Sequence, residues 1–404
     1  MIEKLTAAAH AGELEHAWQD LVHQGTPLVD GTTATFLLRL SELDLDKAEL
    51  AAVRGVHLFL NRITDKQHFN TGLMRQVPET DIWALEMELS PTYRGSYGFR
   101  LFTEKELAGD AATKRPPHNG FLTVADPHGT ERLDNAGGLS VVSGVHAPES
   151  TAWTHRPVNI QGTVISGHLA GSDIDVVGYF PATDKPCAVL TLFDAEAWFD
   201  RISLPTALEA AMAAGMGPVA VLGVRNRDTP HRMQQLRANK DFLAAIATDG
   251  TAWLQKHAAH AGVILDKQRH IIAGQSLGGL SALIAGLQYP ESYHAVIAQS
   301  PSLWFSPDVP GAPGAPHSTQ RSTPRDLDKP SHGWLVEQVY QADRVPARII
   351  IDVGAREGAM VNKAHLLDMA LKSHKARHEL NVYDGGHDYA WWRVALIEHL
   401  FALA

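Results

Sequence analysis

The chain has 404 residues, of which 45% are hydrophobic and 20% are charged, and its formal net charge is −10. A chain of this length and composition is typical of a globular protein with two domains, and the negative charge argues against a nucleic-acid-binding surface. Cys187 is the only cysteine, so no intrachain disulfide can form. Because neither a run of about 18 apolar residues nor a signal-peptide pattern is present, we expect a cytoplasmic protein with no membrane partner.

Residues 1–152 have the pattern of a β domain. Residues 1–21 form a helix-like run, and short apolar segments then follow at regular spacing. In residues 81–89 apolar and acidic side chains alternate with period two, as in a half-buried antiparallel strand with one acidic face. Short strands at this spacing predict a β-sandwich, with the strands at 34–40, 56–61, 81–89 and 93–99.

The pattern changes near residues 147–157, so we expect a second domain over residues 153–404. Here strands alternate with helices, which predicts a mainly parallel sheet with helices on both faces. Strands are expected at 161–168 and 173–180 (an antiparallel pair), 187–193, 218–224, 270–274, 295–298, 348–353 and 380–383, and helices at 207–214, 241–257, 280–287 and 391–403. The proline-rich segment 306–332 is either a surface loop or a lid over the active site.

The stretch Gly274-Gln275-Ser276-Leu277-Gly278 fits the pattern G-x-S-x-G. It lies between an apolar strand and an Ala- and Leu-rich helix, which is the context of a nucleophile elbow. The two glycines are needed because a Cβ at either position would collide with the neighbouring strand or helix. Together with the alternating strands and helices, the elbow predicts an α/β-hydrolase domain with Ser276 as the nucleophile.

A serine hydroxyl needs a base within hydrogen-bond reach and an acid that orients the base. His387 is the expected base, because it follows a strand directly and comes last in the order serine, acid, histidine. The other late histidines are expected to be solvated, namely His365, His374, His378 and His399. The acid is either Asp352 or Glu357. We favour Glu357, which lies on the loop beyond the strand, whereas Asp352 could be a structural carboxylate that pairs with Arg356.

An oxyanion hole requires two backbone N–H donors aimed at the developing negative charge. One is expected from Leu277, the residue after the nucleophile. The other is expected from Ala195, in the loop that follows an earlier strand.

Several segments resemble the ferric enterobactin (enterochelin) esterase family over nearly the whole chain. In the front domain these are 25–29, 81–83 and 93–97. In the back domain they are 274–279, 298–304, 354–357, 384–388 and the pair Trp392-Arg393. The resemblance implies an immunoglobulin-like front domain that helps to close the substrate site, followed by an α/β-hydrolase domain. By position, Ser276, Glu357 and His387 are similar to the family triad, which supports Glu357 over Asp352.

The resemblance also implies a serine esterase that opens the trilactone of a ferric catecholate siderophore after import, so that iron can be released. No cofactor or metal is expected, because the ferric ion belongs to the substrate. A general carboxylesterase of the same fold, for feruloyl or acetyl esters, is the alternative. A non-catalytic binding protein would require a broken triad, and none is visible.

A ferric tris-catecholate carries a charge of roughly −3, so an acidic protein must gather positive side chains locally. Arg232, Arg237 and Arg356 are the candidates, since guanidinium groups form charge-assisted hydrogen bonds with catecholate oxygens. Trp198 and Trp304 are candidates to stack on the catechol rings, with packing as the alternative. The segment 232–239 departs from the family pattern Arg-x-x-Glu-Leu-Pro-Cys-Asn, and Asp194-Ala195 replaces Asp-Gly. These departures bear on which siderophore is the substrate more than on the type of reaction.

Overall fold

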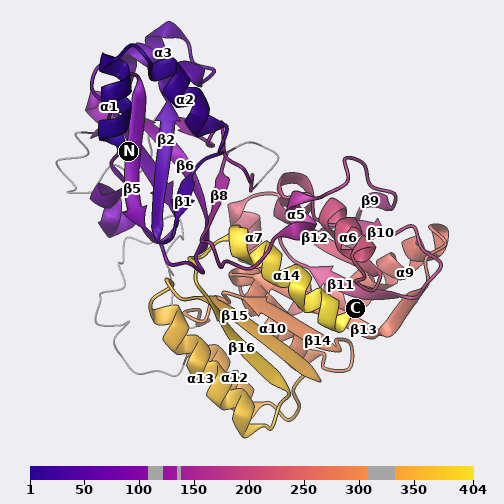
Figure 1. The fold of residues 1–404 in the computed structure, drawn as a ribbon. Helices are drawn as coiled ribbons and strands as arrows, with labels where there is room; N and C mark the ends of the chain where they lie inside the picture. Colours follow the sequence, from indigo (N-terminus) through magenta and orange to yellow (C-terminus); the bar gives the residue numbers. More distant parts are fainter. Residues whose placement is uncertain (108–121, 134–137, 308–332) are drawn as a thin grey trace. The chain divides into compact units, whose positions relative to one another are not determined.

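A computed structural model describes residues 1–107, 122–133, 138–307 and 333–404 (Figure 1). The chain forms two compact units. The first unit contains Met1–Ser150 together with Asp384–Arg393, and the second contains Thr151–Tyr383 together with Val394–Ala404. The sequence does not predict that Asp384–Arg393 returns to the first unit. The proline-rich segment 306–332 was expected to be a loop or a lid, and its residues 308–332 lie outside the described residues.

The first unit contains two antiparallel sheets, which confirms the predicted β-sandwich. One sheet has the order β1-β2-β5-β4, and in the other β6 pairs with β3, β7 and β8. The strands are β1 (Leu28–Asp30), β2 (Thr33–Arg39), β3 (Gly55–Leu60), β4 (Arg75–Gln76), β5 (Ile82–Glu88), β6 (Arg94–Phe102), β7 (Leu122–Val124) and β8 (Ser140–Ser143). The helices are α1 (Ile2–His10), α2 (Leu14–Val22), η1 (Leu40–Glu42), α3 (Lys47–Ala52), η2 (Lys66–Gly72) and α4 (Glu104–Leu107).

One face of β5 agrees with the prediction from the sequence and the other does not. Trp83 packs into the core between the sheets, as predicted. The opposite face was expected to be acidic and solvated, but Ile82 and Ala84 are buried there against Leu5 and Trp18 of the first two helices. Only the second half of the strand alternates between half-buried and exposed residues. The N-terminal run forms two helices rather than one, and buried residues of both helices cover this part of the sheet.

The second unit is built on an eight-stranded sheet with the order β16-β15-β14-β13-β11-β12-β10-β9. The pairs from β16 through β12 are parallel, whereas β10 pairs antiparallel with both β12 and β9. The strands are β9 (Thr163–His168), β10 (Asp175–Phe180), β11 (Cys187–Leu192), β12 (Val219–Arg225), β13 (Leu265–Gln275), β14 (Ala295–Gln299), β15 (Arg348–Gly354) and β16 (His378–Tyr383). The predicted mainly parallel sheet is therefore confirmed.

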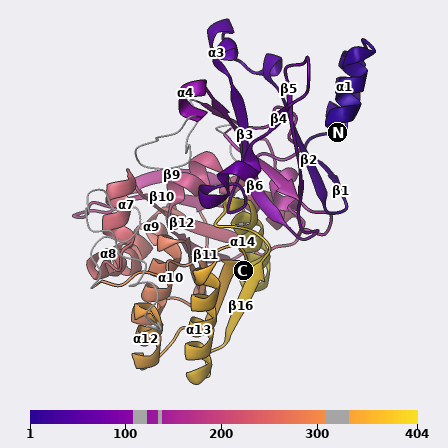
Figure 2. The same cartoon turned by 90° about the vertical axis from the view of Figure 1, so that its left-hand side faces the viewer.

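Helices cover both faces of this sheet (Figures 1 and 2). One face forms a large apolar core with α8, α9, α10, α12 and α13, while α6 and α14 lie on the other face. Parallel strands buried on both faces read as continuous apolar runs, which is why they were recognisable in the sequence. The helices are α5 (Thr151–Thr154), η3 (Glu196–Arg201), α6 (Leu204–Ala213), α7 (Thr229–Leu236), α8 (Lys240–Ala245), η4 (Ile246–Gly250), α9 (Thr251–His260), α10 (Leu277–Gln288), α12 (Trp334–Gln341), α13 (Ala359–Ser373) and α14 (Tyr389–Leu403).

The predicted helix 241–257 is present, but a π-helical stretch interrupts it at Ile246–Gly250. Among the described helices of the second unit, α5, η3, α7, α12 and α13 were not predicted. Among the described residues, no helix combines the length and the apolar character that crossing a bilayer requires.

His270, on β13, is expected to make the protein less stable in acid. The ring is buried, its Nε2 lies 2.9 Å from Thr191 Oγ1, and burial lowers its pKa to about 4. The unfolded chain therefore binds this proton near pH 6.5, whereas the folded chain does not until about pH 4;. The contribution of this group to the free energy of unfolding has its full value above pH 6.5. It decreases as the pH falls, by about 3 kcal/mol at pH 4.

The variant His270→Gln, which cannot titrate, should lose less stability than the parent between pH 7.5 and pH 4.5. Urea unfolding at several pH values measures the difference. A stability difference between parent and variant that stays constant over this range would contradict the prediction. His57, whose pKa burial also lowers to about 4, leaves a residual pH dependence in both proteins.

Candidate active site

Ser276 lies at the sharp turn between β13 and α10, with φ 57° and ψ −118°. A positive φ is strained for a residue with a side chain, and it persists only where the surroundings hold it. The backbone N–H of Ser276 donates to the Gln299 carbonyl at 3.0 Å, and the Ser276 carbonyl accepts from Leu280 N–H at 3.0 Å and from Ser302 N–H at 2.9 Å. These three bonds fix the turn, which has the geometry of a nucleophile elbow.

The two glycines of the elbow allow its close packing. A Cβ added at Gly274 would lie 2.3 Å from the carbonyl carbon of Gly278, which is a direct clash. A Cβ at Gly278 would lie 3.1 Å from the Cβ of Phe193, which is a tight contact. The predicted collision is therefore confirmed at Gly274, whereas at Gly278 the structure shows a tight contact and no direct clash.

The two expected oxyanion donors lie at the ends of neighbouring strands. Leu277 is the first residue of α10, and an N–H in the first turn of a helix has no acceptor within that helix;. Ala195 is buried and follows β11, which pairs with β13. Asp194, just before it, has φ 59°, so the chain turns sharply there. Their role as donors stays a prediction.

Arg232 forms a bidentate ion pair with Asp194, with Nε and Nη2 at 2.6 and 2.7 Å from the two carboxylate oxygens. Asn226 Nδ2 donates to the same carboxylate at 2.8 Å. Planar pairs of this kind are strong and geometrically specific. Arg232 thus fixes the loop that carries Ala195, and its expected contact with the substrate stays a prediction.

Asp352 is fully buried, and the imidazole beside its carboxylate belongs to His399. Its two oxygens lie 3.0 and 2.9 Å from His399 Nε2, and it accepts from Gln299 Nε2 at 3.1 Å and from Asn381 Nδ2 at 3.0 Å. Burial alone would lower the pKa of His399, but the hydrogen bond and charge of Asp352 outweigh it and raise that pKa. The expectation of a solvated His399 is therefore wrong.

Glu357 lies on the loop after β15 and is buried. Its Oε1 accepts from the backbone N–H of Gly354 at 2.8 Å and from the hydroxyl of Ser300. These bonds hold the carboxylate in place just beyond the end of β15, in the same parallel sheet as β13, the strand that leads to Ser276. Since Asp352 is committed to His399, this arrangement favours Glu357 as the acid.

Trp198 is fully buried, and its indole N–H donates to Gln275 Oε1 at 2.8 Å. Gln275 Nε2 then donates to Gln299 Oε1 at 2.9 Å, and Gln299 donates to Asp352. A buried line of side chains therefore runs under the elbow, from the helix after Ala195 to the carboxylate on β15. This burial favours the packing alternative for Trp198, and its expected contact with a substrate stays a prediction.

The remaining expected binding residues lie apart from this network. The guanidinium of Arg237 lies 5.5 Å from the centre of the Phe305 ring, which makes a cation–π contact;. Trp304 packs edge-on against the same ring at 6.4 Å. Arg356 is exposed, beside the buried Glu357. Their contacts with a substrate stay predictions.

His387 belongs to the first unit, on the returning segment Asp384–Arg393. Its backbone N–H donates to Asn61 Oδ1 at 3.0 Å, and its ring packs edge-on against Trp392 at 4.8 Å. The next residue, Asp388, accepts from the backbone and hydroxyl of Ser96 at 2.6 and 2.9 Å. Burial raises the pKa of Asp388. The loop is thus anchored on both sides of the histidine.

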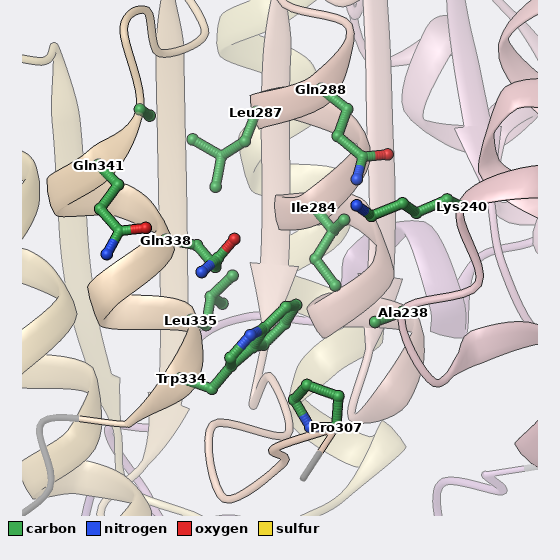
Figure 3. A pocket seen from close by; sticks show the side chains of 11 residues that line it. Ala238, Lys240, Ile284, Leu287, Gln288, Pro307, Trp334, Leu335, Gln338 and Gln341 are labelled. Carbon is green, nitrogen blue, oxygen red and sulfur yellow. The ribbon is translucent and has the colours of Figure 1, made fainter.

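Sequence reasoning missed Ser300, Ser302, Gln299 and His399, although all but His399 lie in the quoted segment 298–304. A pocket of about 580 Å³ in the second unit contains none of the expected site residues (Figure 3). It is lined by Ala238, Lys240, Ile284, Leu287, Gln288, Pro307, Trp334, Leu335, Gln338, Gln341 and Ala342. Within the described part of the chain, no three His, Cys, Asp or Glu side chains are grouped so that they could hold a metal ion.

A strained serine at a strand–helix turn, within a mostly parallel sheet covered by helices, defines an esterase-type α/β hydrolase;. The family model described as "Putative esterase" matches residues 167–403, and the model described as "Enterochelin esterase, N-terminal" matches residues 33–153. The chain belongs to the enterochelin (enterobactin) esterase family.

Characterised relatives are similar over nearly the whole chain. The iron(III) salmochelin esterase of Escherichia coli O6:H1 is 31% identical over 97% of this chain and 94% of its own length. The iron(III) enterobactin esterase of Dickeya dadantii is 29% identical over 98% of this chain and 94% of its own. The crystal structure of ferric enterobactin esterase from Salmonella typhimurium has a TM-score of 0.73 at 25% identity, covering 94% of this chain and 95% of that one.

Proposed function

We propose that this protein is a serine esterase that hydrolyses the trilactone ester bonds of a ferric catecholate siderophore, such as enterobactin or a related compound, and so allows iron release. The observation that carries the proposal is the strained elbow at Ser276 after β13, with the Glu357 carboxylate held on the loop after β15 of the same sheet. The family relationship supports the substrate class, since relatives over the full length are esterases of iron(III) salmochelin and iron(III) enterobactin.

In the proposed mechanism, Ser276 Oγ attacks the ester carbonyl carbon while the His387 imidazole takes its proton. Glu357 orients the imidazole and stabilises its charged form. The carbonyl oxygen becomes an oxyanion, which the backbone N–H groups of Leu277 and Ala195 stabilise. The C–O bond of the ester then breaks, and the imidazolium returns the proton to the leaving serine hydroxyl. Water hydrolyses the resulting acyl-enzyme by the same steps, which regenerates Ser276.

The negative charge of the proposed substrate favours contacts with arginine side chains. The ferric tris-catecholate is anionic, and the chain carries a net charge of −10, so local cations are needed to offset repulsion;. Arg356 beside Glu357, and Arg237 on the loop before α8, are the proposed contacts. Arg232, paired with Asp194, acts in this scheme by fixing the oxyanion loop.

The test compares hydrolysis of ferric enterobactin with that of a short-chain nitrophenyl ester by the purified protein. We expect the higher kcat/KM for ferric enterobactin, and mass analysis should find linear dihydroxybenzoylserine oligomers. The same analysis on the iron-free trilactone determines whether iron must be bound. Much faster turnover of the nitrophenyl ester, with the trilactone left intact, would favour a general carboxylesterase and overturn the proposed substrate.

A further inference from the structure

The loop that follows β14 contacts both proposed catalytic side chains of the second unit. Ser302, on this loop, is 1% exposed, and its hydroxyl oxygen lies 3.3 Å from Ser276 Oγ. Its backbone N–H also donates to the carbonyl of Ser276 at 2.9 Å. Ser302 therefore contacts the proposed nucleophile through both its side chain and its backbone.

Two residues earlier, Ser300 is fully buried and has φ 45°. Its hydroxyl donates to Oε1 of Glu357, and its backbone N–H donates to the Asp352 carbonyl at 2.7 Å. The strained backbone is thus pinned to β15 while the side chain reaches the proposed acid. Since strain of this kind gathers at functional sites, the position is consistent with a constrained role for the hydroxyl.

A serine hydroxyl has one proton to donate and two lone pairs that accept. For Ser276 to give its proton to an imidazole, its oxygen must be held with that proton directed away from other acceptors. A hydroxyl that donates to Oγ from another side does this. The bond also strengthens as Oγ loses its proton and gains negative charge, because hydrogen bonds to charged acceptors are the stronger ones.

We propose that Ser302 and Ser300 are positioning residues of the esterase site. The Ser302 hydroxyl donates to Ser276 Oγ, and the Ser300 hydroxyl donates to the Glu357 carboxylate. One short loop thereby sets the direction of the nucleophile and of the acid together. The inference rests on the proposed function of Ser276 and Glu357, and it adds the two groups that hold them.

The test uses Ser302→Ala and Ser300→Ala, with Ser281→Ala as the matched control. Ser281 is also a fully buried serine, on α10, whose hydroxyl donates to the Leu236 carbonyl at 3.0 Å, so its loss has a similar structural cost. For Ser302→Ala we expect kcat to fall about 10- to 100-fold with KM within about twofold, because the bond acts mainly in the transition state. Ser300→Ala should lower kcat by about tenfold, because Gly354 N–H still holds the carboxylate.

Two further measurements separate positioning from general loss of structure. Ser302→Thr keeps the hydroxyl and should recover most of the parental kcat. The rate at which a fluorophosphonate labels Ser276 should fall in Ser302→Ala and remain parental in Ser281→Ala. If Ser302→Ala keeps the parental kcat and labelling rate, the positioning role is wrong, while the proposed function stands. Hydrolysis by Ser276→Ala at the parental rate would instead remove the proposed function itself.

Discussion

Replacing Ser276 with alanine is expected to lower kcat for ester hydrolysis by about 10⁴- to 10⁶-fold, because the covalent step loses its nucleophile. The residual rate would come from the oxyanion donors and from binding. The free energy of unfolding should stay within about 1 kcal/mol of the parent, since one small side chain changes at a half-buried position;.

Two measurements check this prediction. Product formation from ferric enterobactin is followed by mass analysis, and binding of the same complex is followed by quenching of tryptophan fluorescence. We expect binding to persist in Ser276→Ala, while Ser281→Ala, the buried serine of α10, should hydrolyse at the parental rate. Parental hydrolysis by Ser276→Ala would show that another residue attacks the ester.

The second large effect separates the two candidate acids. We expect Glu357→Gln to lower kcat by about 10²- to 10⁴-fold with little loss of stability, because an amide cannot stabilise the imidazolium of the base. Asp352→Asn should instead lower the stability more than it lowers kcat. Removing the charge that faces the buried His399 should destabilise the fold by about 3 kcal/mol or more, with a smaller effect on kcat in the molecules that remain folded.

The pH dependence of stability provides an independent check on Asp352. His399 has a raised pKa in the folded protein, so its contribution is fully present below about pH 6.5 and is lost as the pH rises through the folded pKa;. This loss should disappear in Asp352→Asn and remain in Glu357→Gln. If Asp352→Asn is stable but inactive while Glu357→Gln remains active, Asp352 is the acid and Glu357 is the structural carboxylate.

Features with a local sequence pattern were predicted well. The strands of the second unit are continuous apolar runs, and the elbow combines a strand, two glycines and a helix within a short window, as in residues 270–287. The steric requirement at Gly274 follows from that window alone, because the atoms that would clash belong to Gly278.

Features that depend on distant partners were not predictable in the same way. His399 lies on an apolar helix and was expected to be solvated, and only its proximity to Asp352, 47 positions earlier in the chain, makes it a buried ion-pair partner. The interpretation of Asp352 as a structural carboxylate named Arg356 as its partner, whereas the structure places His399 beside it. The side-chain donor to Glu357 was missed for the same reason, since Ser300 follows a different strand, 57 positions away.

The burial of β5 shows a further limit of prediction from the sequence pattern. Its alternating pattern was correct for the face that contains Trp83, but the polar-looking face is partly covered by helices from the N-terminus. Period two identifies a strand and one buried face; it does not say whether another element covers the second face.

The return of Asp384–Arg393 to the first unit also limits how this protein can be divided. Arg393 is fully buried and pairs with Glu131, which in turn binds Arg94 at 2.5 Å. A cut after residue 150 would leave Arg393 and Asp388 on a fragment that lacks their partners. The two units are therefore not interchangeable modules: a front unit exchanged by recombination would have to bring its own version of the histidine loop.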